Sequence, residues 1–161
     1  MALPCPSLPV PLLSLMARAL PSKSPWRMRK SSWRSAFTLS IADVAHLDES
    51  DYFGIASGNK VADKFERTGM TATKSKRVDA PVVDQYPITL ECSVVEMQEQ
   101  PYGLRVLGKI ENALADEAVL DEEGKVDPAK LGAFAFDQFQ SGYYALSEKV
   151  GQAWDSGKRL V

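Results

Sequence analysis

The chain has 161 residues, 45% of them hydrophobic, which is enough apolar material for the core of one domain. Its charge is uneven, because residues 1–41 contain six basic and no acidic residues, whereas the remainder contains 13 basic and 21 acidic residues. This acidic body argues against nucleic acid as the main partner.

Cysteine and histidine are too few for a disulfide framework or a metal centre. The sequence contains two cysteines, Cys5 and Cys92, and one histidine, His46. A metal centre of the zinc type needs a cluster of such ligands at close spacing. We therefore expect no metal site, and we expect a reducing, cytoplasmic environment without membrane association. His46 is interpreted as a helix-surface residue.

The first 36 residues differ in composition from the rest of the chain, with six prolines and neither glycine nor acidic residues. Prolines interrupt the apolar run from Leu8 to Met16, and the basic cluster follows it, an order that does not fit a secretory signal peptide. We expect no regular element here. Three interpretations stay open: an organelle transit peptide, a disordered segment, or a misplaced or out-of-frame start. We treat residues 1–36 as an anomalous or disordered leader and residues 37–161 as the domain.

Two helices are predicted after a first strand. The run Phe37 to Ile41 has strand character, and apolar residues recur at roughly helical spacing from Ala42 to Ala56. A second helix is expected from about Lys60 to Arg67, ended by Gly69.

The junction between these helices predicts an anion-binding turn at Ser57-Gly58. Glycine lets the backbone close around a ligand, and the first amides of a helix point outward at its positive end. Lys60 and Lys64 are four residues apart, so both ammonium groups would lie on one helical face. The alternative is an ordinary helix junction, with Gly58 as a C-cap and both lysines in solvent.

A β-hairpin is predicted in the middle of the chain, after a connection over residues 70–86 that lacks periodicity. Its first strand alternates from Ile88 to Val95, with Cys92 inside as a small core residue. A turn at residues 100–103 leads to a returning strand, Leu104 to Ala113, in which Gly108 indicates a bulge or a close backbone approach.

Short elements are predicted after the hairpin. Residues 116–120 form a short strand or turn, and the acidic residues 121–124 form a solvated loop. Asp127-Pro128 is typical of a helix start, here a short helix toward Leu131.

The C-terminal segment is rich in aromatic side chains, and a helix is predicted from about Leu146 to Trp154. Such groups form a core, a dimer contact or the border of a planar cofactor. They are Phe134, Phe136, Phe139, Tyr143, Tyr144 and Trp154.

The order of several segments resembles the flavin reductase-like family, the FMN-binding split-barrel proteins that include flavoredoxin. The resemblance covers residues 37–160, whereas residues 1–36 do not match the strands that the family has there. The segments are FTLSI, YFGIASGNKVADKF, DAPVVDQYPITLEC, GKI, ADEAVLDEEGKVD and YYALSEKVGQAWDSGK.

The resemblance implies a mainly β fold with accessory helices, namely an FMN-binding split barrel that is incomplete at its N-terminus. It also implies a homodimer with FMN bound near the interface. The residues implied beside the flavin phosphate and ribityl chain are Ser57, Gly58, Asn59, Lys60 and Lys64. Lysine suits that position because the phosphate is a dianion at pH 7. The aromatic residues implied near the isoalloxazine are Tyr143, Tyr144 and Trp154.

The implied function is that of a flavin-dependent oxidoreductase, passing electrons from NAD(P)H or a redox-protein partner through FMN. The flavin would supply the chemistry, so no catalytic residue is named. Two alternatives stay open. One is a flavin-binding electron carrier without substrate chemistry of its own, and the other is a non-catalytic remnant altered at its N-terminus.

Overall fold

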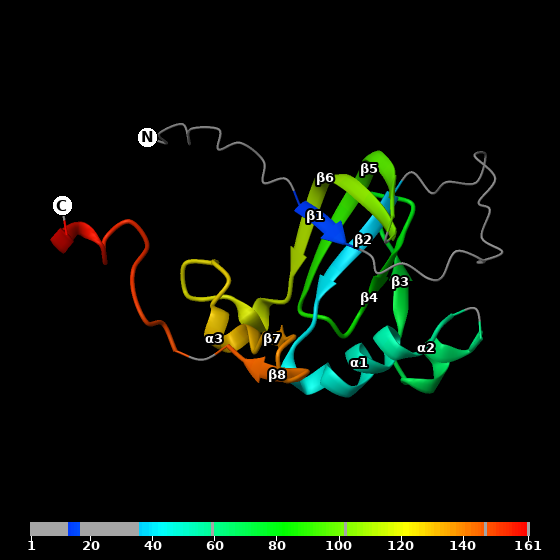
Figure 1. Cartoon of the computed structure of the whole chain (residues 1–161), viewed down its shortest axis with the longest axis horizontal. Helices are drawn as coiled ribbons and strands as arrows, with labels where there is room; N and C mark the ends of the chain where they lie inside the picture. Colours follow the sequence, from blue (N-terminus) through cyan, green and yellow to red (C-terminus); the bar gives the residue numbers. More distant parts are fainter. Residues whose placement is uncertain (1–12, 17–35, 59, 102, 147, 161) are drawn as a thin grey trace. The chain divides into compact units, whose positions relative to one another are not determined.

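The computed structural model describes residues 13–16, 36–58, 60–101, 103–146 and 148–160 (Figure 1). The described chain divides into two compact units. Unit 1 comprises residues up to 40, residues 72–83 and residues 89–114, and unit 2 comprises the rest. Among these residues, strands predominate over helices and no sheet closes on itself, so the mainly β fold with accessory helices is confirmed.

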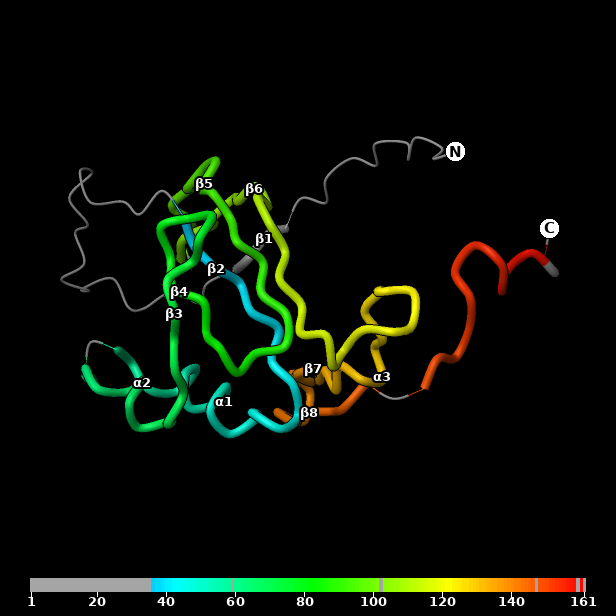
Figure 2. The backbone as a smooth tube through the Cα atoms, turned by 180° about the vertical axis from the view of Figure 1, so that it is seen from behind, coloured from blue at the N-terminus to red at the C-terminus, as the bar shows by residue number. Residues whose placement is uncertain are grey.

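Unit 1 is built on a four-stranded sheet with the order β1-β6-β5-β2. Its strands are β1 (Leu13–Met16), β2 (Ala36–Ile41), β5 (Ile88–Gln100) and β6 (Gly103–Ala115). Figures 1 and 2 show β5 and β6 side by side as one long hairpin. The predicted first strand and the predicted hairpin are thus confirmed, and both hairpin strands run further than expected.

Gly108 on β6 marks a close approach, one of its two predicted roles. A Cβ atom at this position would lie 2.5 Å from Cζ of Phe37 on β2. No side chain can be that close without displacing the ring, so the Phe37 ring needs glycine opposite it.

The start of β5 is buried on both faces, which the alternating pattern did not predict. Cys92 is 1% exposed, as expected for a core residue, but Thr89 and Glu91 are each only 2% exposed. Polar partners make this possible, because an unpaired buried polar group would be costly. The Thr89 hydroxyl lies 2.8 Å from that of Ser40.

A short strand appears in the leader, where no regular element was expected. β1 lies in the leader and pairs antiparallel with β6, from Leu13 opposite Gly108 to Met16 opposite Arg105. The exposed edge of β6 offers unpaired backbone groups that a short strand can satisfy. The leader residues 1–12 and 17–35 lie outside the described residues.

Within residues 70–86, β3 (Ala72–Lys74) and β4 (Pro81–Val83) form a two-stranded antiparallel ladder. The sequence predicted an ordered connection here and no strands, and the structure forms two short strands at these six positions. Three residues per strand are too few for a periodic pattern to show, so the pairing is set by contacts and not by the local sequence.

Unit 2 contains the helices and a second hairpin, β7–β8, which forms a separate two-stranded sheet. Asp127 caps the start of α3, as the sequence predicted, because its side chain accepts a hydrogen bond from the amide of Ala129 at 2.8 Å. Gly132 ends this helix at φ 61°. The helical elements are η1 (Val44–His46), α1 (Leu47–Ile55), α2 (Lys64–Arg67), η2 (Glu117–Val119), α3 (Pro128–Leu131) and η3 (Lys158–Leu160). The strands are β7 (Phe134–Asp137) and β8 (Gly142–Ala145).

Two helix predictions in unit 2 are wrong. The second helix begins at Lys64 instead of Lys60. Where a helix from about Leu146 to Trp154 was predicted, residues 148–152 have no regular structure and residues 153–157 form a turn. In that segment the carbonyl of Gln152 accepts from both the amide and the hydroxyl of Ser156. A helix there would also have no buried face, since Trp154 is 94% exposed.

Candidate functional site

The loop that follows α1 is closed by its own backbone. The amides of Lys60 and Val61 donate to the carbonyl of Ser57 at 2.9 and 3.0 Å. These amides are therefore not the outward-pointing donors of a helical first turn. α2 has only four residues, so the dipole argument for anion binding at its start does not apply.

Lys64 reaches back to the end of α1. Its ammonium donates to the carbonyl oxygens of Phe53 at 3.3 Å and Ala56 at 3.1 Å, and it lies 5.6 Å from the centroid of the Phe53 ring. A cation at a helix C-terminus interacts favourably with the negative end of the dipole, and the face of an aromatic ring adds to this attraction. Lys64 therefore fastens the loop to α1.

Aromatic stacking and a glycine shape the same place. The Phe53 and Phe65 rings stack at 5.7 Å with an angle of 17° between their planes. At Gly58, an added Cβ would meet Cε of Lys64 at 3.8 Å, which is an ordinary contact. The structure thus brings Gly58 and Lys64 together, while Asn59 lies outside the described residues.

The charge of the loop fits an anionic group such as a phosphate. Lys60 is exposed and Lys64 is partly exposed, which gives two positive charges within five residues. Asp63 and Glu66 oppose them, Arg67 is paired with Asp63, and the C-terminus of α1 adds about half a negative elementary charge. Residues 57–67 thus contain three basic and two acidic side chains, a net charge of +1, and lysine is a suitable donor for phosphate oxygens.

Tyr143 on β8 is joined to α1. Its hydroxyl donates to a carboxylate oxygen of Asp51 at 2.6 Å, and this hydrogen bond raises the pKa of the Tyr143 phenol. Its ring packs edge-on against Phe134 at 5.3 Å and at a tilt against Phe136 at 5.4 Å. The same helix thus carries both the loop and the anchor of Tyr143.

The other two predicted aromatic residues are less fixed. The Tyr144 hydroxyl lies 3.5 Å from the Gln140 side chain, at the limit of a hydrogen bond, and half of Tyr144 is exposed. Trp154 has a φ of 59° and is 94% exposed, so it is not packed with the other predicted residues.

An open cavity of about 420 Å³ lies between α1 and the end of α2, but none of the seven predicted site residues that the structure describes lines it. Arg67 in its wall is paired with Asp63 through its Nε atom at 3.0 Å. The two carboxylates in the wall make it a poor phosphate site, so the chemistry of the loop outweighs the size of the cavity. Its lining residues are Asp48, Glu49, Tyr52, Arg67 and Thr68.

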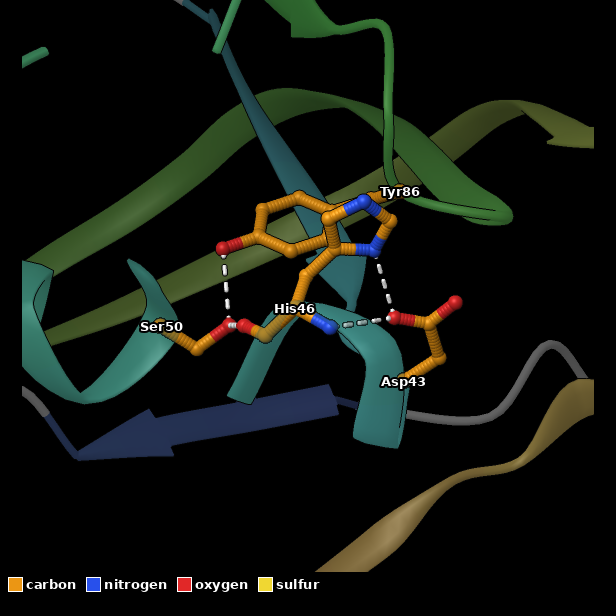
Figure 3. A network of polar contacts seen from close by, with 4 residues as sticks. All are labelled: Asp43, His46, Ser50 and Tyr86. Atoms are coloured by element: carbon orange, nitrogen blue, oxygen red, sulfur yellow. Dashed lines mark hydrogen bonds and ion pairs between the residues drawn. The ribbon is translucent and has the colours of Figure 1, made fainter. Parts of the chain in front are cut away.

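A polar network that the sequence did not predict surrounds His46 (Figure 3). Nδ1 of His46 lies 2.6 Å from Asp43, and its ring meets Tyr86 edge-on at 6.2 Å. Ser50 donates to the backbone carbonyl of His46 at 2.6 Å and lies 2.9 Å from the Tyr86 hydroxyl. His46 is therefore partly buried and not a simple helix-surface residue.

This network is built to hold α1 rather than to act as a nucleophile. A serine nucleophile needs the imidazole as its base, but Ser50 bonds the carbonyl of His46 and not the ring. Asp43 also accepts from the amide of His46 at 3.0 Å, which caps the helical segment. An Asp-x-x-His spacing before a helix is the sequence signal that could have indicated the pair.

Within the described part of the chain, no helix is long and apolar enough to cross a membrane. The same residues contain no group of three or more His, Cys, Asp or Glu side chains that could hold a metal ion. Burial raises the pKa of the Cys92 thiol, so this cysteine is not a reactive thiolate.

This chain matches known proteins in structure, whereas searches by family model and against curated proteins find no match. Solved structures do match, among them the flavoredoxins of Desulfovibrio vulgaris (Miyazaki F) and Methanosarcina acetivorans. The first is 31% identical with a TM-score of 0.78, covering 92% of this chain and 76% of that chain. The second is 26% identical with a TM-score of 0.72, and the match covers 80% of this chain and 67% of that chain.

A more distant match is an FMN-binding domain of a flavin reductase-like enzyme from Shewanella baltica. It is 21% identical with a TM-score of 0.58, covers 71% of this chain and 62% of that chain, and supports the split-barrel fold alone. The match with the D. vulgaris protein covers a larger share of this chain than residues 37–160 make up.

The split-barrel prediction is confirmed by these neighbours. Identity of 31% over three quarters of a known flavoredoxin is also enough to establish kinship. This chain belongs to the flavin reductase-like split-barrel family that includes flavoredoxin.

Proposed function

We propose that this protein binds FMN and is a flavin-dependent oxidoreductase that takes electrons from NAD(P)H or a redox-protein partner. The observation that carries the proposal is the 31% identity with a flavoredoxin, at a TM-score of 0.78. The bound flavin would supply the redox chemistry. The residues of this chain bind the cofactor, orient it and limit the access of water.

The loop after α1 would hold the phosphate. The positive charges of this loop are those of Lys60 and Lys64, and Ser57, Gly58 and Asn59 belong to the same loop. A lysine ammonium that meets a dianion forms charge-assisted hydrogen bonds, which are shorter and stronger than neutral ones. Gly58 lets the backbone approach the ligand because it has no side chain in the way.

The aromatic residues of the C-terminal segment would border the flavin ring. Tyr143 is fixed by Asp51 and by two phenyl rings, so it is the rigid member of the group. Tyr144 and Trp154 have the exposed faces that a planar ring system can cover.

The proposal includes a cytoplasmic homodimer. Several large apolar side chains near the C-terminus are at least 84% exposed, which is unfavourable in an isolated protomer. They are Phe139, Val150, Trp154 and Leu160. Light scattering after size exclusion should give twice the 17.7 kDa mass of one chain, and a mass of one chain would contradict the dimer.

The visible spectrum of the purified full-length chain tests the function. We expect flavin absorption bands that bleach when NADH or NADPH is added without oxygen. Bands that bleach only with dithionite would show a carrier without nicotinamide chemistry. A colourless protein that takes up no added FMN would overturn the proposal and would support the non-catalytic alternative.

A further inference from the structure

We infer that the two lysines of the loop have separate tasks: Lys64 fastens the loop to α1, and Lys60 delivers the charge that meets the flavin phosphate. The inference rests on the proposed function, because it divides the roles within the proposed phosphate loop. It assigns the phosphate contact to one residue where the sequence pattern treated both lysines alike.

The end of α1 needs a partner that its own sequence does not supply. Its C-cap, Ala56, is extended at φ −84° and ψ 113°, and no basic residue lies in its last turn. The last carbonyls of a helix have no partner within the helix and must find one elsewhere. Lys64 bonds the carbonyls of Phe53 and Ala56, so its position is set by the helix end.

The surroundings of the Lys64 ammonium already satisfy most of its bonding capacity. An ammonium has three N–H donors, and the two carbonyls accept two of them. Its charge also lies over the Phe53 ring, which Phe65 in turn stacks against. A move toward a ligand would break these contacts, so Lys64 acts best in its present place.

Lys60 combines a fixed backbone with an uncommitted ammonium group. Its amide bonds the carbonyl of Ser57 at 2.9 Å, which places it on the closed turn. Its side chain is exposed, and within the described residues the structure assigns it no hydrogen bond or ion pair. A phosphate therefore displaces no protein contact when Lys60 binds it.

FMN and riboflavin separate the phosphate contact from all other contacts, because they differ only in the phosphate. The experiment measures the dissociation constants of both flavins by fluorescence quenching, at low and high salt, and the Tm of the ligand-free full chain. For Lys60→Gln we expect an unchanged Tm and a roughly tenfold fall in the preference for FMN over riboflavin, as for one lost charge-assisted hydrogen bond. The salt dependence of FMN binding should also weaken.

Lys64→Gln should give the opposite result. We expect the ligand-free Tm to fall by about 2–4 °C for each kcal/mol lost. The preference for FMN should stay within about twofold of the parent value, a change too small for a lost ionic contact, and the salt dependence should persist. Phe53→Leu keeps both lysines and removes only the ring. It should repeat this result in milder form if Lys64→Gln does not fold, and Lys64→Arg should restore the Tm.

Three results would speak against the assignment in different ways. An equal loss of FMN preference in Lys64→Gln and Lys60→Gln, at an unchanged Tm, would overturn the division of tasks. Equal affinity of the parent chain for FMN and riboflavin would show that the loop holds no phosphate, and the inference would fall with it. Binding of neither flavin would reject the proposed function itself.

Discussion

Glu91 in unit 1 and Lys64 in unit 2 are both charged side chains held by two hydrogen bonds, yet their surroundings differ. Glu91 is 2% exposed and accepts from the Ser75 hydroxyl and from Nδ2 of Asn112, the latter at 2.6 Å. Lys64 is only partly buried and donates to two carbonyls on a surface loop.

The difference separates a structural charge from a charge that a ligand can approach. The donors from Ser75 and Asn112, with a weaker attraction from Arg77, hold the pKa of Glu91 below its usual value although burial opposes this. The carboxylate is thereby satisfied inside the protein and joins the β3–β4 turn to both hairpin strands. A charge in such a place supports the fold, whereas a charge on the α1 loop remains within reach of solvent and ligand.

The largest expected effect is that of Glu91→Ala, which leaves Ser75 and Asn112 without their acceptor. We expect a loss of roughly 2–4 kcal/mol in the free energy of unfolding, because buried donors stay unpaired. Urea titration followed by circular dichroism measures it. The matched control is Glu99→Ala on the exposed end of β5, with a change within about 0.5 kcal/mol. Equal losses in Glu91→Ala and Glu99→Ala would show that the buried Glu91 stabilises the fold no more than an exposed glutamate does.

Two glycines extend the comparison to backbone packing. For Gly108→Ala we expect a loss of about 1–3 kcal/mol, the usual cost of overpacking, because the new Cβ would overlap the Phe37 ring. Gly58→Ala should cost less than about 0.5 kcal/mol, because its Cβ would meet only Lys64 Cε at an ordinary distance. Calorimetry measures the Tm of both variants. A larger fall in Tm for Gly58→Ala than for Gly108→Ala would contradict this prediction.

The pH dependence of stability isolates the Glu91 charge. Because its pKa is lowered in the folded state, Glu91 stabilises the protein above its unfolded value of about 4.3, and this contribution is lost as the pH falls through the folded pKa. Unfolding midpoints measured from pH 7 to pH 3 should therefore fall less steeply in Glu91→Gln than in the parent chain. Parallel curves would show that Glu91 is not a source of acid sensitivity.

The smallest effect concerns a helix cap in unit 2. Asp127→Ala removes the side-chain acceptor for the amides of Ala129 and Lys130 at the start of α3, which should cost about 1 kcal/mol. Asp127→Asn is the matched control, because an amide oxygen can still cap the helix. Hydrogen exchange of the Leu131 amide, which bonds the Asp127 carbonyl, reports on this local change. Identical exchange in the two variants would argue against the side-chain cap.

Strong local signals made part of the fold predictable from the sequence. The alternation before and after the turn at residues 100–103 was enough for the β5–β6 hairpin, and Asp127-Pro128 was enough for the start of α3. The turn at Ser57-Gly58 was also located correctly, although its proposed ligand remains a prediction.

Contacts between distant residues were not predictable in this way. The burial of Glu91 depends on Ser75, 16 residues before it, and on Asn112, 21 residues after it. The bond between Tyr143 and Asp51 spans 92 residues. A pattern within one segment contains no information about such partners, and for the same reason it placed Thr89 and Glu91 on the outside of β5.

The sequence by itself determined the β5–β6 hairpin, the start of α3 and the position of a lysine-containing turn, because alternation, turn residues and caps act within a few neighbouring residues. The mainly β fold as a whole was implied by the resemblance to the family. Only the tertiary structure decided how that turn is built. It replaced the expected helix start at Lys60 with a closed turn and placed Lys64 on the carbonyls of α1. The physical reason is that the unpaired carbonyls at a helix end must be satisfied, and here an ammonium group from outside the helix binds two of them.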